Sequence, residues 1–488
     1  MDTHNSQETQ NAQPVPIRKS LLSLLQITVE PIFLLLFFCF SLTEAAGTNF
    51  LLTRTCTVVY GFSEDNCTDK MSPSTLEIIQ PYTARIIMGK SLIEATFPAI
   101  LSLFIGSWTD GNKKRKPFII LPLIGFTMVY AFWLIFMYFP IPPIYFLLAV
   151  LPYSLSGGLI SLFTCAYCYL SDVTTESNRA FRMTVLNVSL TIGMLSGYLV
   201  STEIYKTVHT NVNFVLFGTS LCCMILILMY TIFLLPEIVI NTEEIEISEE
   251  RRSKKSFFSI SHIKESLAVL LKNRPSNGRA LLILLTAIIV IDILVFQGES
   301  NFKFLSLKAS FHWTAEDYNV FSAILSGVAV VTSLAGMWLL NRVLGLSGTF
   351  TTSLVLSMCC ISSVLISLSK SSTGFYSSAL FGCLAVLLSP LIKSEISYVV
   401  PNSEIGKVFA FTSTLEAIAP FAASPVYTEV YNAVISTKPL YLYFVSAGFW
   451  FLAFVLSLGI VFINCRHGHS KYQPLNDEPV DESNSTNS

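Results

Sequence analysis

Several ionisable side chains lie inside long apolar stretches of this chain, where an isolated charge is costly. Charged groups in such surroundings usually face a partner or a water-filled cavity. A carboxyl group removed from water generally titrates above the reference pKa of about 4.3, a range that suits a carrier driven by an acidic compartment. The sequence therefore indicates a site for a solute or for protons, with the candidates Glu44, Lys90, Glu94, Asp292, Lys393 and Glu416.

Several of these side chains also have a structural interpretation. Lys90 and Glu94 are four residues apart and could satisfy each other on one face of a helix. Lys393 is a candidate counter-ion for an anionic solute, and an ion pair within the protein is the alternative. Cys165 and Cys168 resemble half of a metal site, but no second pair accompanies them. We expect neither a metal nor another cofactor.

The composition places these residues in a membrane protein. Hydrophobic residues make up 52% of the 488 positions and charged residues 13%, and the mean hydropathy is +0.61. A soluble protein has about 25% charged residues. The formal net charge of −2 gives no indication of nucleic-acid binding. Without an HExxH or GxSxG motif, an enzyme is the least favoured class.

The apolar residues are gathered into stretches long enough to cross a bilayer, for which about 20 residues suffice. The first stretch reads as a retained span, because it is too long for the apolar core of a signal peptide. We expect twelve membrane helices at 31–53, 83–107, 117–139, 143–170, 182–202, 212–235, 280–298, 318–340, 348–368, 373–395, 405–430 and 438–464. The fold class is thus an all-α integral membrane protein in a lipid bilayer.

A long polar segment at 236–279 divides the twelve stretches into two sets of six. This predicts an N-terminal half at 31–235, a C-terminal half at 280–464, and tails at 1–30 and 465–488. Lysine and arginine are concentrated in the N-terminal tail and in every second loop, including 236–279. Because cytosolic loops are enriched in these residues, we expect both termini and the 236–279 linker in the cytosol.

The loop between the second and third stretches contains a Gly, then an Asp four residues later, then a basic cluster. Gly106 allows close helix approach, and Asp110 can bond to a helix N-terminus and to nearby basic groups. Lys114 and Arg115 belong to the basic cluster. We expect this motif to lock one face of the protein and to release it when that face opens; a plain basic loop is the alternative.

Three short features lie outside the expected spans. Cys56 and Cys67 share the first polar loop and could pair if that loop is luminal or extracellular. Asn66 begins a glycosylation sequon in the same loop. Tyr472 and Leu475 form a Tyr-x-x-hydrophobic pattern in the C-terminal tail, which resembles an endolysosomal sorting signal read by cytosolic adaptors.

The Gly106–Asp110 motif and the six-plus-six division resemble the major facilitator superfamily, whose solute site lies between the two halves. Further motifs resemble solute-carrier family 46 within it, over about residues 29–464. They are Val29-Glu30-Pro31, Ser171-Asp172-Val173, Phe181-Arg182-Met183, Ser389-Pro390, Pro401-Asn402-Ser403-Glu404 and Glu416 with Pro425, Tyr427 and Tyr431. The resemblance implies a carrier of folates, steroid conjugates, muropeptides or related metabolites.

The chain departs from the family pattern at several positions. Lys393 stands where other members have arginine, which keeps the charge but loses the bidentate fork. Asn187 stands where the folate-transporting member has a glutamate, and Asn cannot titrate. That member also joins its first loop to the loop after span 7, but 299–317 contains no cysteine. These differences argue against folate itself.

The sequence thus predicts a secondary active transporter that moves a small organic solute, anionic or amphipathic, by alternating access with protons. A non-transporting membrane receptor or adaptor on the same fold is the alternative. The endolysosomal membrane and the plasma membrane both remain open as its location.

Overall fold

The computed structural model describes residues 28–68, 71–112, 115–174, 176–208, 210–236, 272, 277–336, 340, 343, 345–400 and 402–466. All regular elements within these residues are helical. The helices of the first half are α2 (Glu30–Arg54), α3 (Pro73–Asn112), α4 (Lys116–Tyr138), α5 (Phe146–Leu155), α6 (Gly158–Val173), α7 (Glu176–Thr207) and α8 (Val212–Phe233). Those of the second half are α11 (Gly278–Phe311), α12 (Ala315–Val331), α13 (Gly348–Leu368), α14 (Ser372–Phe381), α15 (Leu388–Val399), α16 (Asn402–Val434) and α17 (Tyr443–Arg466).

Each of the twelve expected spans falls on helical structure. In the described part of the chain, nine segments are long and apolar enough to cross a membrane. The other three expected spans fall on α3, on α12 with the π-helical turn Thr332–Gly336, and on α16. Twelve spans are therefore consistent with the structure. Several helices exceed the expected bounds, and α11 in particular continues to Phe311 rather than ending at 298.

The fourth and tenth spans are interrupted helices. The fourth is broken between α5 and α6, where Gly157 and Gly158 both have positive φ. The tenth contains the 3₁₀ turn Gly382–Leu387 between α14 and α15. Helix breaks at membrane depth are tolerated where protein or a water-filled cavity surrounds them. The two breaks occupy corresponding positions in the two halves.

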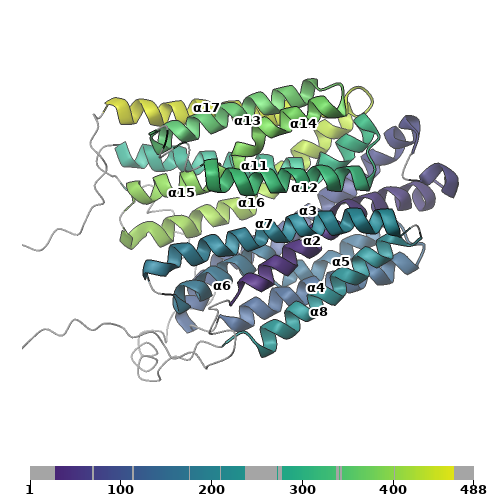
Figure 1. Ribbon diagram of the computed structural model, residues 1–488, viewed down its shortest axis with the longest axis horizontal. Coiled ribbons are helices and arrows are strands. Elements are labelled where there is room, and N and C mark those ends of the chain that lie inside the picture. Colours follow the sequence, from purple (N-terminus) through teal and green to yellow (C-terminus); the bar gives the residue numbers. More distant parts are fainter. Residues whose placement is uncertain are drawn as a thin grey trace, which may run out of the picture.

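The helices run along the long axis of Figure 1, with α2–α8 on one side and α11–α17 on the other. We call the end with the Cys56–Cys67 disulfide the disulfide end (right in Figure 1). The opposite end, where α8 ends and α11 begins, is the linker end. Helices α3 and α7 of the first half lie against α16 and α12 of the second.

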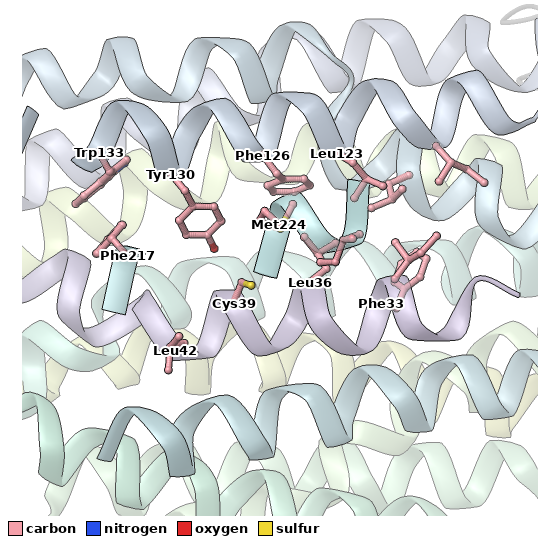
Figure 2. Close-up of a cluster of buried hydrophobic side chains, with 14 of the residues drawn as sticks. Phe33, Leu36, Cys39, Leu42, Leu123, Phe126, Tyr130, Trp133, Phe217 and Met224 are labelled. Carbon is pink, nitrogen blue, oxygen red and sulfur yellow. The ribbon is translucent and has the colours of Figure 1, made fainter. Parts of the chain in front are cut away.

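The first half has its own hydrophobic core, formed mainly by α2, α4 and α8 (Figure 2). Trp133 of α4 stacks on Phe217 of α8 with ring centroids 4.8 Å apart. Cys39 of α2 points between these two helices. A second core in the other half is built from α11, α13, α15 and α17. Each half can therefore retain its packing when the halves move relative to each other.

Two glycines bring α7 into backbone contact with α2. A Cβ atom at Gly193 would collide with the carbonyl of Leu34, and one at Gly197 with the carbonyl of Phe38. The small-x-x-x-small spacing thus packs two helices of the same half closely together.

A third hydrophobic cluster joins the halves, and it lies at the disulfide end. It includes Leu52 and Ile79 from the first half with Phe302, Tyr318 and Tyr431 from the second. Burial at this end therefore holds the two halves together.

Candidate functional site

The carboxylate of Glu44 on α2 accepts hydrogen bonds from both halves of the protein. The Tyr318 hydroxyl, from α12, donates to its Oε1 at 2.7 Å, and the Tyr198 hydroxyl, from α7, donates to its Oε2. Both tyrosines are at most 5% exposed. A single carboxylate thus connects α2 and α7 to a helix of the other half.

Four more hydrogen-bonded groups accompany Glu44, and together with it we call them the polar layer. Lys308 donates to Asn49 at 2.9 Å, and Asn319 donates to the Ser201 hydroxyl at 2.9 Å. The other two groups are Gln80 with Tyr431 and the carbonyl of Leu305, and Ser91 with Asn301 and Ser424.

Every group in the polar layer joins one half to the other. Its members come from the disulfide-end portions of α2, α3, α7, α11, α12 and α16. Most are buried, as polar groups are when hydrogen bonds satisfy them. The polar layer and the third hydrophobic cluster therefore close the space between the halves at the disulfide end.

Three predicted candidates from the second half lie together on the linker side of the polar layer. Lys393 of α15 forms an ion pair with Glu416 of α16, with Nζ and Oε1 3.4 Å apart. Asp292, near the middle of α11, interacts electrostatically with both. The side chains of Lys393 and Glu416 are 40% and 22% exposed. Charged groups rarely face lipid, so this exposure indicates an accessible space within the bundle.

The first half has a matching pair on α3. Lys90 Nζ lies 3.4 Å from Glu94 Oε1, and the two side chains are 41% and 30% exposed. The mutual pairing considered from their spacing is therefore present, and both groups stay accessible. Lys90 directly precedes Ser91 of the polar layer.

The loop-motif residues are described only in part. Gly106 and Asp110 belong to the end of α3, and Lys114 lies outside the described residues. Arg115 is buried at the start of α4. At the same end, Arg182 of α7 binds Glu30 of α2 with a 2.7 Å contact, and this ion pair links elements within the first half.

The remaining predicted features have the following positions. Cys56 and Cys67 form a disulfide, and Asn66 is exposed beside it. Tyr472 and Leu475 lie outside the described residues, as does most of the 236–279 linker.

Sequence reasoning missed most of the polar layer. Lys308 was excluded because the seventh span was expected to end at 298, whereas α11 continues past it. Tyr198 and Tyr318 resemble ordinary interface aromatics until their shared partner is known. An Asn within an expected apolar span was an available signal, which Asn49 and Asn319 carried, whereas Gln80 lay just outside the expected second span.

Comparisons with known proteins agree with this architecture. The family model for the Major Facilitator Superfamily matches residues 91–424. The human organic anion transporter MFSD10 has a similar structure, with a TM-score of 0.61 and 16% identity over 88% of this chain and 97% of that chain. The inward-open xylose transporter XylE from E. coli has a TM-score of 0.60 and 14% identity, over 90% of this chain and 96% of that chain.

Relatives in sequence carry the solute-carrier 46 name, as the motifs implied. The probable peptidoglycan muropeptide transporter SLC46 of Drosophila melanogaster is 24% identical over 92% of this chain and 88% of its own length. The lysosomal proton-coupled steroid conjugate and bile acid symporter SLC46A3 of Gallus gallus is 24% identical over 84% of this chain and 88% of its own length. The proton-coupled folate transporter of Bos taurus is 21% identical over 89% of this chain and 91% of its own length. The chain belongs to the major facilitator superfamily of membrane transporters and is related within it to solute-carrier family 46.

Proposed function

We propose that this transporter moves a small organic solute, anionic or amphipathic, together with protons by alternating access. The supporting observation is an asymmetry along the bundle axis. The polar layer closes the disulfide end, whereas Lys393 and Glu416 on its linker side are 40% and 22% exposed. A solute site reached from one side at a time is the requirement of alternating access.

The proposal includes an orientation. Lysine and arginine gather in the 236–279 linker and in the other segments at that end. The positive-inside rule then supports a cytosolic linker end, with both termini cytosolic. In this orientation the structure is closed toward the lumen or exterior and accessible from the cytosol. Residues 31–235 and 280–464 would move as two halves about the linker.

The exposed lysines support an anionic group on the solute. Lys393 is paired with Glu416 and is influenced by Asp292, so two carboxylates neutralise it while no solute is present. With both acids protonated, the ammonium would be available to a solute carboxylate, sulfate or phosphate. The relatives' names, which include a proton-coupled symporter of steroid conjugates and bile acids, agree with this class.

We further propose an endolysosomal membrane, with the exposed Asn66 glycosylated in the lumen and Tyr472 and Leu475 read by sorting adaptors. The SLC46A3 relatives are named as lysosomal. The polar tail is accessible to such adaptors if the termini are cytosolic.

Uptake by cells tests the function. A double variant, Tyr472→Ala with Leu475→Ala, should bring the full chain to the surface, where the luminal side faces the medium. Uptake of steroid sulfates, muropeptides, folates and lysosomal catabolites is then measured at pH about 5.5 and 7.4, which spans the titration of a desolvated carboxyl group. We expect one anionic class to enter faster at the acidic pH. No uptake of any class at either pH, with surface expression verified, contradicts this substrate range and favours the receptor alternative.

Charge variants test the site within the same assay. Lys393→Gln should reduce uptake about tenfold or more, the effect of losing one charge-assisted hydrogen bond of about 1.5–3 kcal/mol. Lys393→Arg keeps the charge and should retain most uptake. The matched control is Lys370→Gln, an exposed lysine between α13 and α14. Equal uptake by the Lys393→Gln and Lys370→Gln variants refutes a role for Lys393.

A further inference from the structure

We propose that Glu44 is a proton-binding site that controls the disulfide end, so that binding one proton there releases α12 from the first half. This inference rests on the proposed proton-coupled function and assigns it a residue and a mechanical step. It is carried by the position of the carboxylate, which receives hydrogen bonds from both halves.

The geometry fits an ionised carboxylate. Both phenol hydroxyls donate, one to each oxygen of Glu44. A protonated carboxyl group keeps one good acceptor oxygen, and the phenol that faces its hydroxyl has to turn and accept instead of donate. Protonation therefore replaces two hydrogen bonds to a charged acceptor by neutral ones, which are roughly half as strong.

Among the groups of the polar layer, Glu44 is the one acid. Helix α2 packs against α7, α8, α3, α11 and α12. Helix α8 has no charged side chain within Val212–Phe233. On α11, the ammonium of Lys308 binds Asn49, five residues beyond Glu44. Apart from this ammonium and Glu44, the side chains of the layer are neutral.

Several other charged residues of these helices have partners of their own. On α11, Glu299 interacts with Ser446 of α17 and with Lys303. On α3, Lys90 and Glu94 pair with each other beside Ser91 of the layer. On α7, Glu203 pairs with Lys206 beyond the layer, and Arg182 binds Glu30 at the linker end. On α12, Asp317 is bound in the capping box at the helix start. Glu44 is thus the acid of the polar layer whose own hydrogen bonds reach both halves.

The direction of coupling follows from linkage. The closed disulfide end stabilises the ionised form of Glu44, so the proton binds more favourably when the phenols have moved away. The closed state is thus favoured at neutral pH and loses stability as the pH falls. An acidic lumen would open the disulfide end and admit the solute, and loss of the proton to the cytosol would close it again.

A distance measurement separates this step from transport. Thr207, at the end of α7, and Ser436, after α16, are exposed residues at the disulfide ends of different halves. Spin labels on Thr207→Cys and Ser436→Cys report the opening in the purified full chain in lipid nanodiscs. The two exposed free cysteines, Cys222 and Cys465, are first replaced by serine, and label positions are verified by mass spectrometry.

The wild-type chain should show a larger long-distance population at pH about 5 than at about 7.5, since protonation of Glu44 weakens its hydrogen bond to the other half. Glu44→Gln mimics the protonated acid and should show that open population at both pH values. Glu44→Asp keeps a titratable group and should keep the pH dependence. Glu395→Gln is the matched control for removing an acid within an expected membrane span, and it should respond to pH as the wild-type chain does.

Two results overturn the inference. One is a Glu44→Gln variant whose distances still change with pH as in the wild-type chain. The other is a wild-type chain whose distances do not depend on pH. Neither result depends on knowing the solute, so failure of this inference is distinct from failure of the proposed transport. Conversely, absence of solute uptake together with pH-dependent distances would leave the Glu44 site supported.

Discussion

Replacing Gln80 by leucine provides a quantitative test of the polar layer. Gln80 is fully buried on α3, and its Oε1 accepts a 2.6 Å hydrogen bond from Tyr431 on α16. Leucine has a similar size, so the packing should change little. The variant nevertheless leaves the fully buried Tyr431 hydroxyl without its acceptor.

The cost of stranding such a donor is about 1–3 kcal/mol. Because this contact joins the two halves, the cost falls on the closed disulfide end rather than on either half alone. A loss of about 2 kcal/mol lowers the ratio of closed to open molecules roughly 30-fold, since about 1.4 kcal/mol corresponds to a factor of ten.

The double variant Gln80→Leu with Tyr431→Phe decides whether this reasoning is correct. Phenylalanine removes the stranded hydroxyl, and replacing both partners by apolar groups of the same shape can be nearly neutral. The spin-label distances between positions 207 and 436 measure the closed-to-open ratio for all four members of the cycle. We expect the double variant to recover most of the closed population. If the effects of the two single variants simply add, the hydrogen bond is not what holds the halves together.

Three further outcomes can be measured. Reducing the Cys56–Cys67 disulfide, which closes a loop of sequence separation 11, should lower the unfolding free energy by about 3 kcal/mol, visible as a lower thermal unfolding temperature; no change on reduction contradicts this. Gly197→Val should abolish folded protein because its side chain meets the α2 backbone, whereas Gly218→Ala, with open space around it, should express normally; equal yields contradict the close packing. Asn66→Gln should increase electrophoretic mobility as much as glycosidase treatment does, and unchanged mobility means that the sequon is unused.

The fold was predictable because its main determinant is local. Each apolar stretch of about 20 residues forms a helix in lipid regardless of its neighbours, since backbone hydrogen bonds must be satisfied within the segment. The helix ends were less predictable, because the bundle also buries polar turns beyond the hydrocarbon. Lys308 illustrates this, as its charge would normally end a span, yet Asn49 from another helix accepts a hydrogen bond from its ammonium.

The site was predictable only as a set of candidates. An acid in an apolar stretch indicates a cavity or a partner, which is why Asp292, Lys393 and Glu416 could be selected. That these three meet, and that Glu44 instead meets two tyrosines, depends on helix rotation and on contacts far apart in sequence. Tyr318 lies 274 residues from Glu44. Uniformly apolar helices have no periodicity that fixes such rotations.

The glycine contact between α7 and α2 makes the two hydrogen bonds of Glu44 mechanically unequal. Gly193 and Gly197 let the backbones of α7 and α2 touch, so Tyr198 moves together with Glu44 as part of the same half. The hydrogen bond to Tyr318 crosses to the other half and must break whenever the halves separate. Tyr198 thus orients the carboxylate within its own half, while the hydrogen bond to Tyr318 is the one that breaks and re-forms. Loss of the Tyr318 hydroxyl should weaken the contact between the halves, and loss of the Tyr198 hydroxyl should only misalign the Glu44 carboxylate.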